Sequence, residues 1–175
     1  VGDFLHTRSF QMMVEAGSMR IMEILSEATN VIAEGEVLQL MNMHDASLDE
    51  AGYLRFIRSK TSKLFEASAR LGAILANSPP DVEEACATYG QALGTAFQII
   101  DDVLDYDGDA AEMGKNLGDD LREGNSTLPL IAALERGTSS HAEVVPNAPE
   151  QGSTDQLTAF VRIVSQPASF VVPTS

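Results

Sequence analysis

Apolar residues recur at intervals of three and four along most of the chain, and this helical period constrains the fold more than any other feature. The period predicts one helix that ends near Gly17 and another over about residues 18–41. It predicts further helices over about 47–75, 81–106 and 126–136. A capping box at 47–50 opens the first of these three. No segment alternates apolar and polar residues as a strand would. We therefore expect an all-α fold.

Composition excludes several classes of protein. The 175 residues include 26 acidic and 11 basic ones, and a net charge of −15 argues against nucleic acid as a partner. No apolar run approaches the length of a membrane span. The single cysteine, Cys86, excludes a disulfide framework and a cysteine-rich zinc site, and no signal peptide is visible, so we expect a cytoplasmic protein. The chain starts at Val1 in helix-like sequence, and we expect it to be part of a longer protein.

The chain changes character twice after the fourth predicted helix. Residues 107–125 are polar and rich in glycine, which predicts a long loop or two short turns. Beyond Gly137 four prolines interrupt the apolar pattern, and only about 153–164 still has a helical stripe. We expect residues 1–137 to form the packed portion of the chain and residues 138–175 to form a weakly ordered tail with that one helix.

Three aspartates near the end of a predicted helix are the strongest chemical signal. Asp101, Asp102 and Asp105 lie on nearly one helix face, which Gln98 extends. Like charges at this spacing destabilise a helix, and the C-terminal end of the helix dipole disfavours anions. Carboxylate oxygens suit Mg²⁺, so the cluster predicts a magnesium site, against the alternative of a solvated acidic helix end. Residues 101–123 hold nine acids, including the pair Asp119-Asp120, and only two bases, which favours the metal.

A basic segment precedes the acidic one. Five of the eleven basic residues lie within residues 55–70. Lys60 is four residues from Phe56 and from Leu64, so it lies on or beside the apolar stripe, and Thr61 offers a hydroxyl. The ammonium group of such a lysine could bind a diphosphate. Alternatively, its methylene groups could pack on the apolar stripe while the ammonium group reaches water, and the spacing alone favours this second interpretation.

Two glycines, Gly90 and Gly94, lie inside the helix that carries the aspartates. Each costs close to 1 kcal/mol there relative to alanine. They predict a close approach of another helix or of a bulky ligand.

Together these segments resemble the trans-type polyprenyl diphosphate synthase family, and the bacterial long-chain enzymes of the octaprenyl or solanesyl type most of all. The segment 94–105, Gly-Thr-Ala-Phe-Gln-Ile-Ile-Asp-Asp-Val-Leu-Asp, is similar to the second aspartate-rich motif of that family. Residues 114–121 and 124–130 continue the match, and Lys60-Thr61 is similar to the family's Lys-Thr motif. The likeness covers about residues 1–137 closely and 151–164 more loosely, and it corresponds to the C-terminal part of such an enzyme.

The resemblance implies an isoprenoid synthase-type helical bundle that is incomplete here, with its N-terminal helices missing. It implies Mg²⁺-dependent condensation of an allylic prenyl diphosphate with isopentenyl diphosphate, giving a long-chain product for quinone side chains. Asp101, Asp102 and Asp105 then correspond to metal ligands. The catalytic and substrate-binding residues would be Lys60, Thr61, Gln98 and Lys115, with Gln39 also at the substrate. A homodimer is implied for the full-length enzyme.

The sequence departs from the family pattern in ways that bear on activity. No first aspartate-rich motif precedes the second, so we expect this chain to be inactive by itself. Asn125 stands where many relatives carry lysine, and Pro146 and Pro149 fall where relatives continue a helix. Three alternatives stay open: a non-catalytic partner subunit of a two-component synthase, a class I terpenoid cyclase of the same fold, and an acidic helical scaffold.

Overall fold

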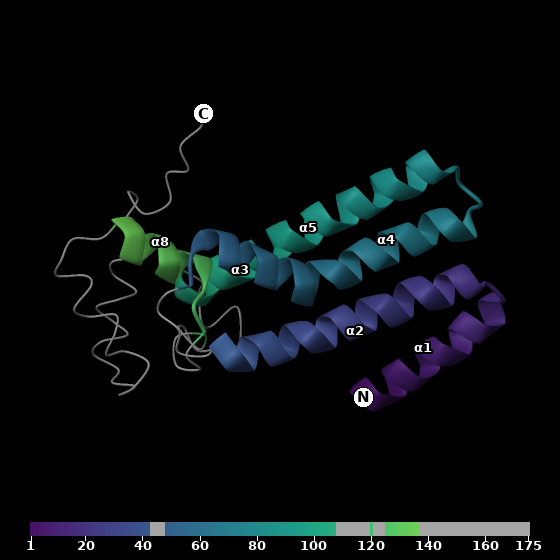
Figure 1. Ribbon diagram of the computed structural model, residues 1–175, viewed down its shortest axis with the longest axis horizontal. Coiled ribbons are helices and arrows are strands. Elements are labelled where there is room, and N and C mark those ends of the chain that lie inside the picture. Colours follow the sequence, from purple (N-terminus) through teal and green to yellow (C-terminus); the bar gives the residue numbers. More distant parts are fainter. Residues whose placement is uncertain (43–47, 108–119, 121–124, 137–175) are drawn as a thin grey trace. The chain divides into compact units, whose positions relative to one another are not determined.

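A computed structural model of the chain describes residues 1–42, 48–107, 120 and 125–136, and all its elements in these ranges are helices (Figure 1). Within these ranges there is no strand, which confirms the expected all-α fold. Contacts divide the chain into two compact units. The first unit comprises Val1–Val37 and Ile57–Thr95, and the second comprises Leu38–Phe56 and Ala96–Ser175. The tail expected over 138–175 lies outside the described residues.

The first two helices begin and end close to where the sequence places them. Helix α1 spans Gly2–Ala16, and α2 spans Met19–Asn42. Gly17 has φ +65°, and its N–H donates to the Val14 carbonyl at 3.1 Å. Glycine adopts this left-handed conformation without the steric cost of a side chain, so it ends α1 and the chain reverses into α2 (Figure 1).

The next helix is interrupted where the sequence predicts a continuous one. Helix α3 spans Glu50–Ile57, a π-helical turn η1 spans Arg58–Ser62, and α4 spans Lys63–Leu75. Asp49 caps α3, because its carboxylate accepts a hydrogen bond from the Gly52 N–H at 2.7 Å. Ser47, the first residue of the expected capping box, lies outside the described residues. Period arguments cannot detect one wider turn inside a helical run.

Helix α5 spans Pro80–Asp107 and α8 spans Leu128–Arg136, close to the predicted ranges. Small side chains let α5 approach α4 within the first unit. A Cβ at Gly94 would lie 2.7 Å from the Ser62 Cα, and one at Gly90 would lie 2.5 Å from the Phe65 carbonyl oxygen. The predicted reason for the two glycines, close approach of another helix, is therefore confirmed.

Alanines fill much of the interior of the first unit, and larger side chains fill that of the second. The buried apolar residues of the first unit are Met13, Ile21, Ala28, Ile57, Ala67, Ala73 and Ala87. Those of the second unit are Tyr53, Tyr106, Leu130 and Ile131. Two buried tyrosines in one unit require partners for their hydroxyl groups.

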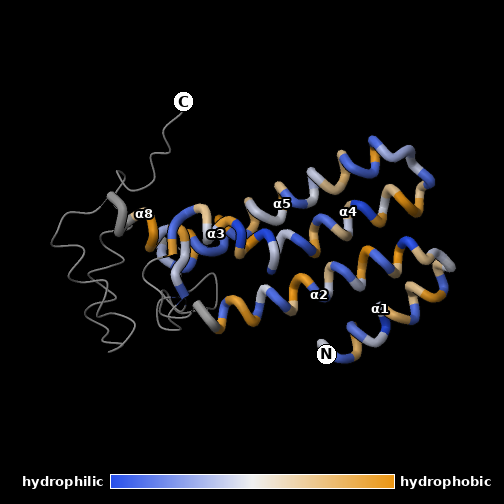
Figure 2. Tube along the Cα trace, viewed as in Figure 1, coloured by the Kyte–Doolittle hydropathy of each residue, from blue (hydrophilic) through white to orange (hydrophobic). Residues whose placement is uncertain are grey.

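Apolar and polar residues intermingle along the helices (Figure 2). Helix α1 exposes large apolar side chains. Phe4, Leu5 and Val14 are each at least 60% exposed. No helix in the described part of the chain has the length and apolar character of a membrane span.

Two alanine substitutions in the first unit are expected to change stability in opposite directions. Gly90→Ala gains about 1 kcal/mol of helix propensity but forces a methyl group against the Phe65 backbone and the Ala69 Cβ, at 2.5 and 2.9 Å. Overpacking costs about 1–3 kcal/mol, so a net loss is expected. Gly72→Ala adds a methyl group in α4 with no atom within 4 Å and should gain up to about 1 kcal/mol. Urea unfolding measures both, and a stabilised Gly90→Ala would contradict the close helix contact.

Candidate functional site

The acidic end of α5 is built around Asp102, which is 3% exposed. The Tyr53 hydroxyl of α3 donates to Asp102 Oδ2 at 2.5 Å, and Gln98 Nε2 donates to Oδ1 at 2.8 Å. Both carboxylate oxygens therefore accept a hydrogen bond. Asp101 and Asp105, by contrast, are only half-buried. The spacing places all three aspartates near one face, and the structure separates Asp102 as the inner member.

A series of hydrogen bonds links Asp105 to residues that are distant in sequence. The Asp120 N–H donates to Asp105 Oδ2 at 3.2 Å. The Asn125 N–H donates to the Asp120 carbonyl oxygen at 2.9 Å, and the Asn125 amide donates to Asp120 Oδ1 at 3.4 Å. Gln39 Nε2 donates to Asn125 Oδ1 at 3.0 Å. The predicted substrate residue Gln39 is thus linked through Asn125 and Asp120 to the predicted metal ligand Asp105.

Burial and mutual repulsion perturb this acidic group. Burial raises the pKa of Asp102, against the hydrogen bonds from Tyr53 and Gln98, which lower it. Burial, followed by the charge of Asp105, raises the pKa of Asp120 to about 6. Burial and Asp102 likewise raise the pKa of the Tyr53 hydroxyl, which keeps it a proton donor. The neutral donors Tyr53, Gln98 and Asn125 offset part of the cost of burying Asp102 and Asp120.

Oxygen donors and a concentration of negative charge fit a hard divalent cation such as Mg²⁺. No group of three or more His, Cys, Asp or Glu side chains among the described residues is arranged to enclose a metal. Mg²⁺ commonly takes only one or two carboxylates and completes its shell with water and substrate phosphates. The donor set fits that mode of binding, and the three-aspartate metal site stays a prediction.

Lys60 and Thr61 lie in the π-helical turn η1 of the first unit. Lys60 Nζ forms an ion pair with Glu36 Oε1 at 3.1 Å, and the Lys60 side chain is 33% exposed. A Cβ at Gly35 would lie 3.5 Å from the Lys60 backbone nitrogen, so α2 runs close to the turn. Single π-helical turns inside helices often coincide with functional sites.

The neighbouring Ser62 fixes η1 against α5. Ser62 is fully buried, and its hydroxyl lies 3.0 Å from the Thr95 hydroxyl. The Thr95 hydroxyl also donates to the Gln91 carbonyl oxygen at 2.8 Å. The backbone that carries Lys60 and Thr61 is thereby held within the first unit.

The predicted site residues fall into three groups. Lys60 and Thr61 belong to the first unit, while Gln39, Gln98 and the three aspartates belong to the second unit. Within the second unit the structure brings Gln98 to Asp102, and Gln39 to Asn125. Lys115 lies outside the described residues.

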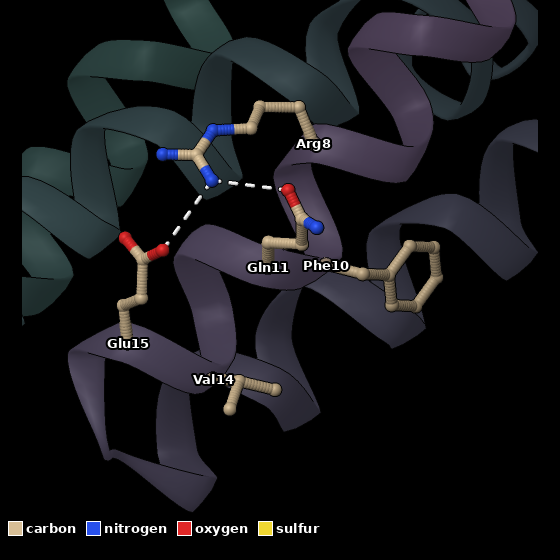
Figure 3. A pocket seen from close by; sticks show the side chains of 5 residues that line it. All are labelled: Arg8, Phe10, Gln11, Val14 and Glu15. Carbon is tan, nitrogen blue, oxygen red and sulfur yellow. Dashed lines mark hydrogen bonds and ion pairs between the residues drawn. The ribbon is translucent and has the colours of Figure 1, made fainter.

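Two hollows in the first unit are lined by none of these predicted residues. One, of about 430 Å³, lies on α1, where Arg8 Nη1 contacts Gln11 and Glu15 at 3.0 and 3.3 Å (Figure 3). The other, of about 290 Å³, is lined by three acidic, three basic and two apolar side chains. Beside it Glu83 accepts from Arg20 and Arg70, at 2.5 and 3.2 Å, in an ion-pair network. Balanced charge favours a structural role for this second hollow.

Two residues of the acidic site were not singled out by sequence reasoning. Tyr53 looks like an ordinary apolar position of a helix, and its partner Asp102 is 49 residues away. A buried tyrosine hydroxyl usually needs a partner, and that was the available signal. Asp120 was noted only as part of an acidic stretch, because its approach to Asp105 depends on the tertiary fold.

The sequence matches the family described as "Polyprenyl synthetase" over residues 1–164. The chain belongs to the polyprenyl synthetase family. It is 54% identical over 157 residues to the octaprenyl diphosphate synthase of Escherichia coli, covering 90% of this chain and 49% of that protein. It is 44% identical over 164 residues to the all-trans-nonaprenyl-diphosphate synthase of Rhodobacter capsulatus, covering 94% and 50%. The chain thus spans about half the length of these polyprenyl synthetases.

Solved structures of polyprenyl synthetases share the fold. A polyprenyl synthase from Caulobacter crescentus, complexed with calcium and isoprenyl diphosphate, has a TM-score of 0.88 and 46% identity. The match covers 93% of this chain and 50% of that one. A heptaprenyl diphosphate synthase from Staphylococcus aureus has a TM-score of 0.89 and 26% identity, covering 96% and 52%. The expected isoprenoid synthase-type helical fold is confirmed.

Proposed function

We propose that the chain supplies the metal-dependent diphosphate site of a long-chain polyprenyl diphosphate synthase. The observation that carries the proposal is the acidic group of the second unit, in which the end of α5 carries Asp101, Asp102 and Asp105 and the Asp120 N–H donates to Asp105 Oδ2 at 3.2 Å. The identity to octaprenyl and nonaprenyl synthases supports the same assignment. The substrates would be an allylic prenyl diphosphate and isopentenyl diphosphate.

The predicted site residues have proposed roles in this chemistry. Bound Mg²⁺ would neutralise the diphosphate as it leaves the allylic carbon. Asp101 and Asp105 would hold the cation, with Asp102 and Asp120 adding negative charge beside them. Lys60 would hold a diphosphate oxygen as a point charge, and Thr61 would offer its hydroxyl to the substrate. Lys115 would add a second positive charge. The allylic carbon, having lost its diphosphate as pyrophosphate, would form a new C–C bond with the electron pair of the isopentenyl double bond. The cation so formed on the isopentenyl unit would then release a proton from its neighbouring carbon to the pyrophosphate or to water, which gives the new double bond.

Two alternatives use the same fold. A relative 37% identical over 147 residues is named heptaprenyl diphosphate synthase component 2, from Geobacillus stearothermophilus, so a two-component arrangement occurs among such proteins. A purely non-catalytic partner has no need of the acidic group at Asp102. A terpenoid cyclase would also bind a metal and a diphosphate, but the relatives support chain elongation instead.

The proposal is tested by calorimetry with the 175-residue chain, inorganic pyrophosphate and Mg²⁺. We expect pyrophosphate to bind in the presence of Mg²⁺ and binding to be lost in EDTA. Absence of Mg²⁺-dependent binding would contradict the proposal and favour the scaffold or partner alternatives.

We extend the proposal to a cytoplasmic location and to a homodimer of the full-length enzyme. The exposed apolar side chains of α1 support the dimer, and light scattering tests it.

Lys60→Ala is expected to weaken Mg²⁺-dependent pyrophosphate binding by about tenfold and to leave the fold intact. Its ion pair with Glu36 is partly exposed, and such pairs contribute about 0–1 kcal/mol to stability. A matched control is Arg58→Ala, which removes an exposed positive charge from the same turn. Equal affinity in wild type and Lys60→Ala would show that Lys60 only covers the apolar stripe. The measurement is calorimetry with a melting curve for each variant.

A further inference from the structure

Tyr53 of α3 contributes a side-chain hydrogen bond to the acidic group. Its side chain is 1% exposed, and its hydroxyl meets Asp102 Oδ2 at 2.5 Å. Gln98, one helical turn earlier on α5, donates a hydrogen bond to the other carboxylate oxygen of Asp102. Asp102 is therefore held from two helices, by two neutral donors.

This arrangement restricts what Asp102 can do. A buried carboxylate is costly unless each oxygen is hydrogen-bonded, so both donors stabilise the inward side-chain conformation. Asp101 precedes Asp102 directly, and Asp105 lies one turn later on the same helix. Fixing Asp102 therefore fixes the rotation of α5 at this point, and with it the directions of its two half-buried neighbours.

We propose that Tyr53 is a positioning residue for the metal-dependent diphosphate site: with Gln98 it holds Asp102 inward and so sets Asp101 and Asp105 for the cation. The proposal rests on the proposed function, because it assigns Tyr53 a role only if that site binds Mg²⁺ and diphosphate. Tyr53 itself touches neither. It acts through the Asp102 carboxylate, which distinguishes it from the predicted ligands.

The other buried tyrosine of the second unit is a matched control. Tyr106 is also 1% exposed, and its hydroxyl lies 3.0 Å from the Thr127 hydroxyl. Tyr53→Phe and Tyr106→Phe each remove one buried hydroxyl from the same unit. The first removes the donor to Asp102, and the second removes the hydroxyl that lies against Thr127.

The test is a calorimetric titration of Mg²⁺ at fixed pyrophosphate with the 175-residue chain. We expect Tyr53→Phe to weaken apparent Mg²⁺ affinity about tenfold, because a hydrogen bond to a charged group is lost. Tyr106→Phe should stay within about twofold of wild type. If Tyr53 acts through Asp102, then Tyr53→Phe should have almost no further effect in an Asp102→Asn background, as a double-mutant cycle would show.

Fluorine NMR of wild-type chain with 3-fluorotyrosine covers the case in which Tyr53→Phe does not fold. The chain has three tyrosines, and Tyr89, 66% exposed on α5, gives a reference signal. We expect the Tyr53 signal to move when Mg²⁺ and pyrophosphate are added together and the Tyr89 signal to stay. Three results would each overturn the role of Tyr53 and leave the proposed function standing. They are an unmoved Tyr53 signal, unchanged Mg²⁺ affinity in Tyr53→Phe, and an equal loss of Mg²⁺ affinity in Tyr106→Phe. Failure of wild type to bind pyrophosphate with Mg²⁺ would instead overturn the proposed function.

Discussion

Asp101→Asn and Asp105→Asn should each weaken Mg²⁺-dependent pyrophosphate binding by about a hundredfold. The amide keeps the shape of the carboxylate but loses the charge, and one lost ligand to a divalent cation costs several kcal/mol. Both side chains are half-buried, so their hydration before binding is partial and the lost attraction is poorly replaced by water. Calorimetry at several Mg²⁺ concentrations separates lost affinity for the metal from lost affinity for pyrophosphate.

A matched control for these variants lies on the same helix. Asp81 is exposed in the first turn of α5, so Asp81→Asn removes the same charge without touching the acidic group. It should bind pyrophosphate as wild type does. Undiminished binding in both Asp101→Asn and Asp105→Asn would show that the acidic end of α5 is not the metal site.

Asp120→Asn is expected to change how stability depends on pH. The pKa of Asp120 rises from its ordinary 3.8 to about 6 in the folded chain, because of burial and then the charges of Asp105 and Asp102. Between about pH 4 and 6 the folded state keeps a proton that the unfolded state releases. The free energy of unfolding of wild type should therefore fall as pH rises through this window.

Asparagine at position 120 does not titrate, so the contribution of Asp120 to the pH dependence of the free energy of unfolding disappears in this variant. In EDTA the variant should match wild type most closely near pH 4 and exceed it in stability above pH 6. Part of the slope should survive, because burial also raises the pKa of Asp102. Glu34→Gln on the exposed face of α2 controls for net charge. Urea unfolding at pH 4, 5, 6 and 7.5 measures the effect, and parallel curves for Asp120→Asn and wild type would contradict it.

Helix positions could be predicted from the sequence because their causes are local. The apolar period and Pro80 set α5, and Gly17 ends α1. The π-helical turn η1 could not be predicted from the apolar period, and the contact of its Ser62 with Thr95, 33 residues away, depends on the tertiary fold. Asp49 caps α3 two residues after Ser47, where the expected capping box begins.

The candidate site was predicted only in part, for a related reason. Spacing on one helix placed Asp101, Asp102 and Asp105 together, but it could not tell which of them turns inward. That distinction comes from Tyr53, on another helix. The role of Asn125 was likewise hidden, since its bond to Gln39 joins residues 86 positions apart. Chemistry carried by one helix was visible in the sequence, and chemistry shared between helices was not.

The interleaving of the two units has a consequence for synthesis on the ribosome. The first unit takes its segments from residues 1–37 and 57–95, whereas the second needs 38–56 and everything from Ala96 onward. Chains are made from the N-terminus, so the segments of the first unit are all available once Thr95 has emerged. Tyr53 can form its hydrogen bond with Asp102 only after Asp102 has emerged from the ribosome, and Gln39 can form its hydrogen bond with Asn125 only after Asn125 has emerged. The nascent chain therefore completes the scaffold around Lys60 before the acidic group can assemble.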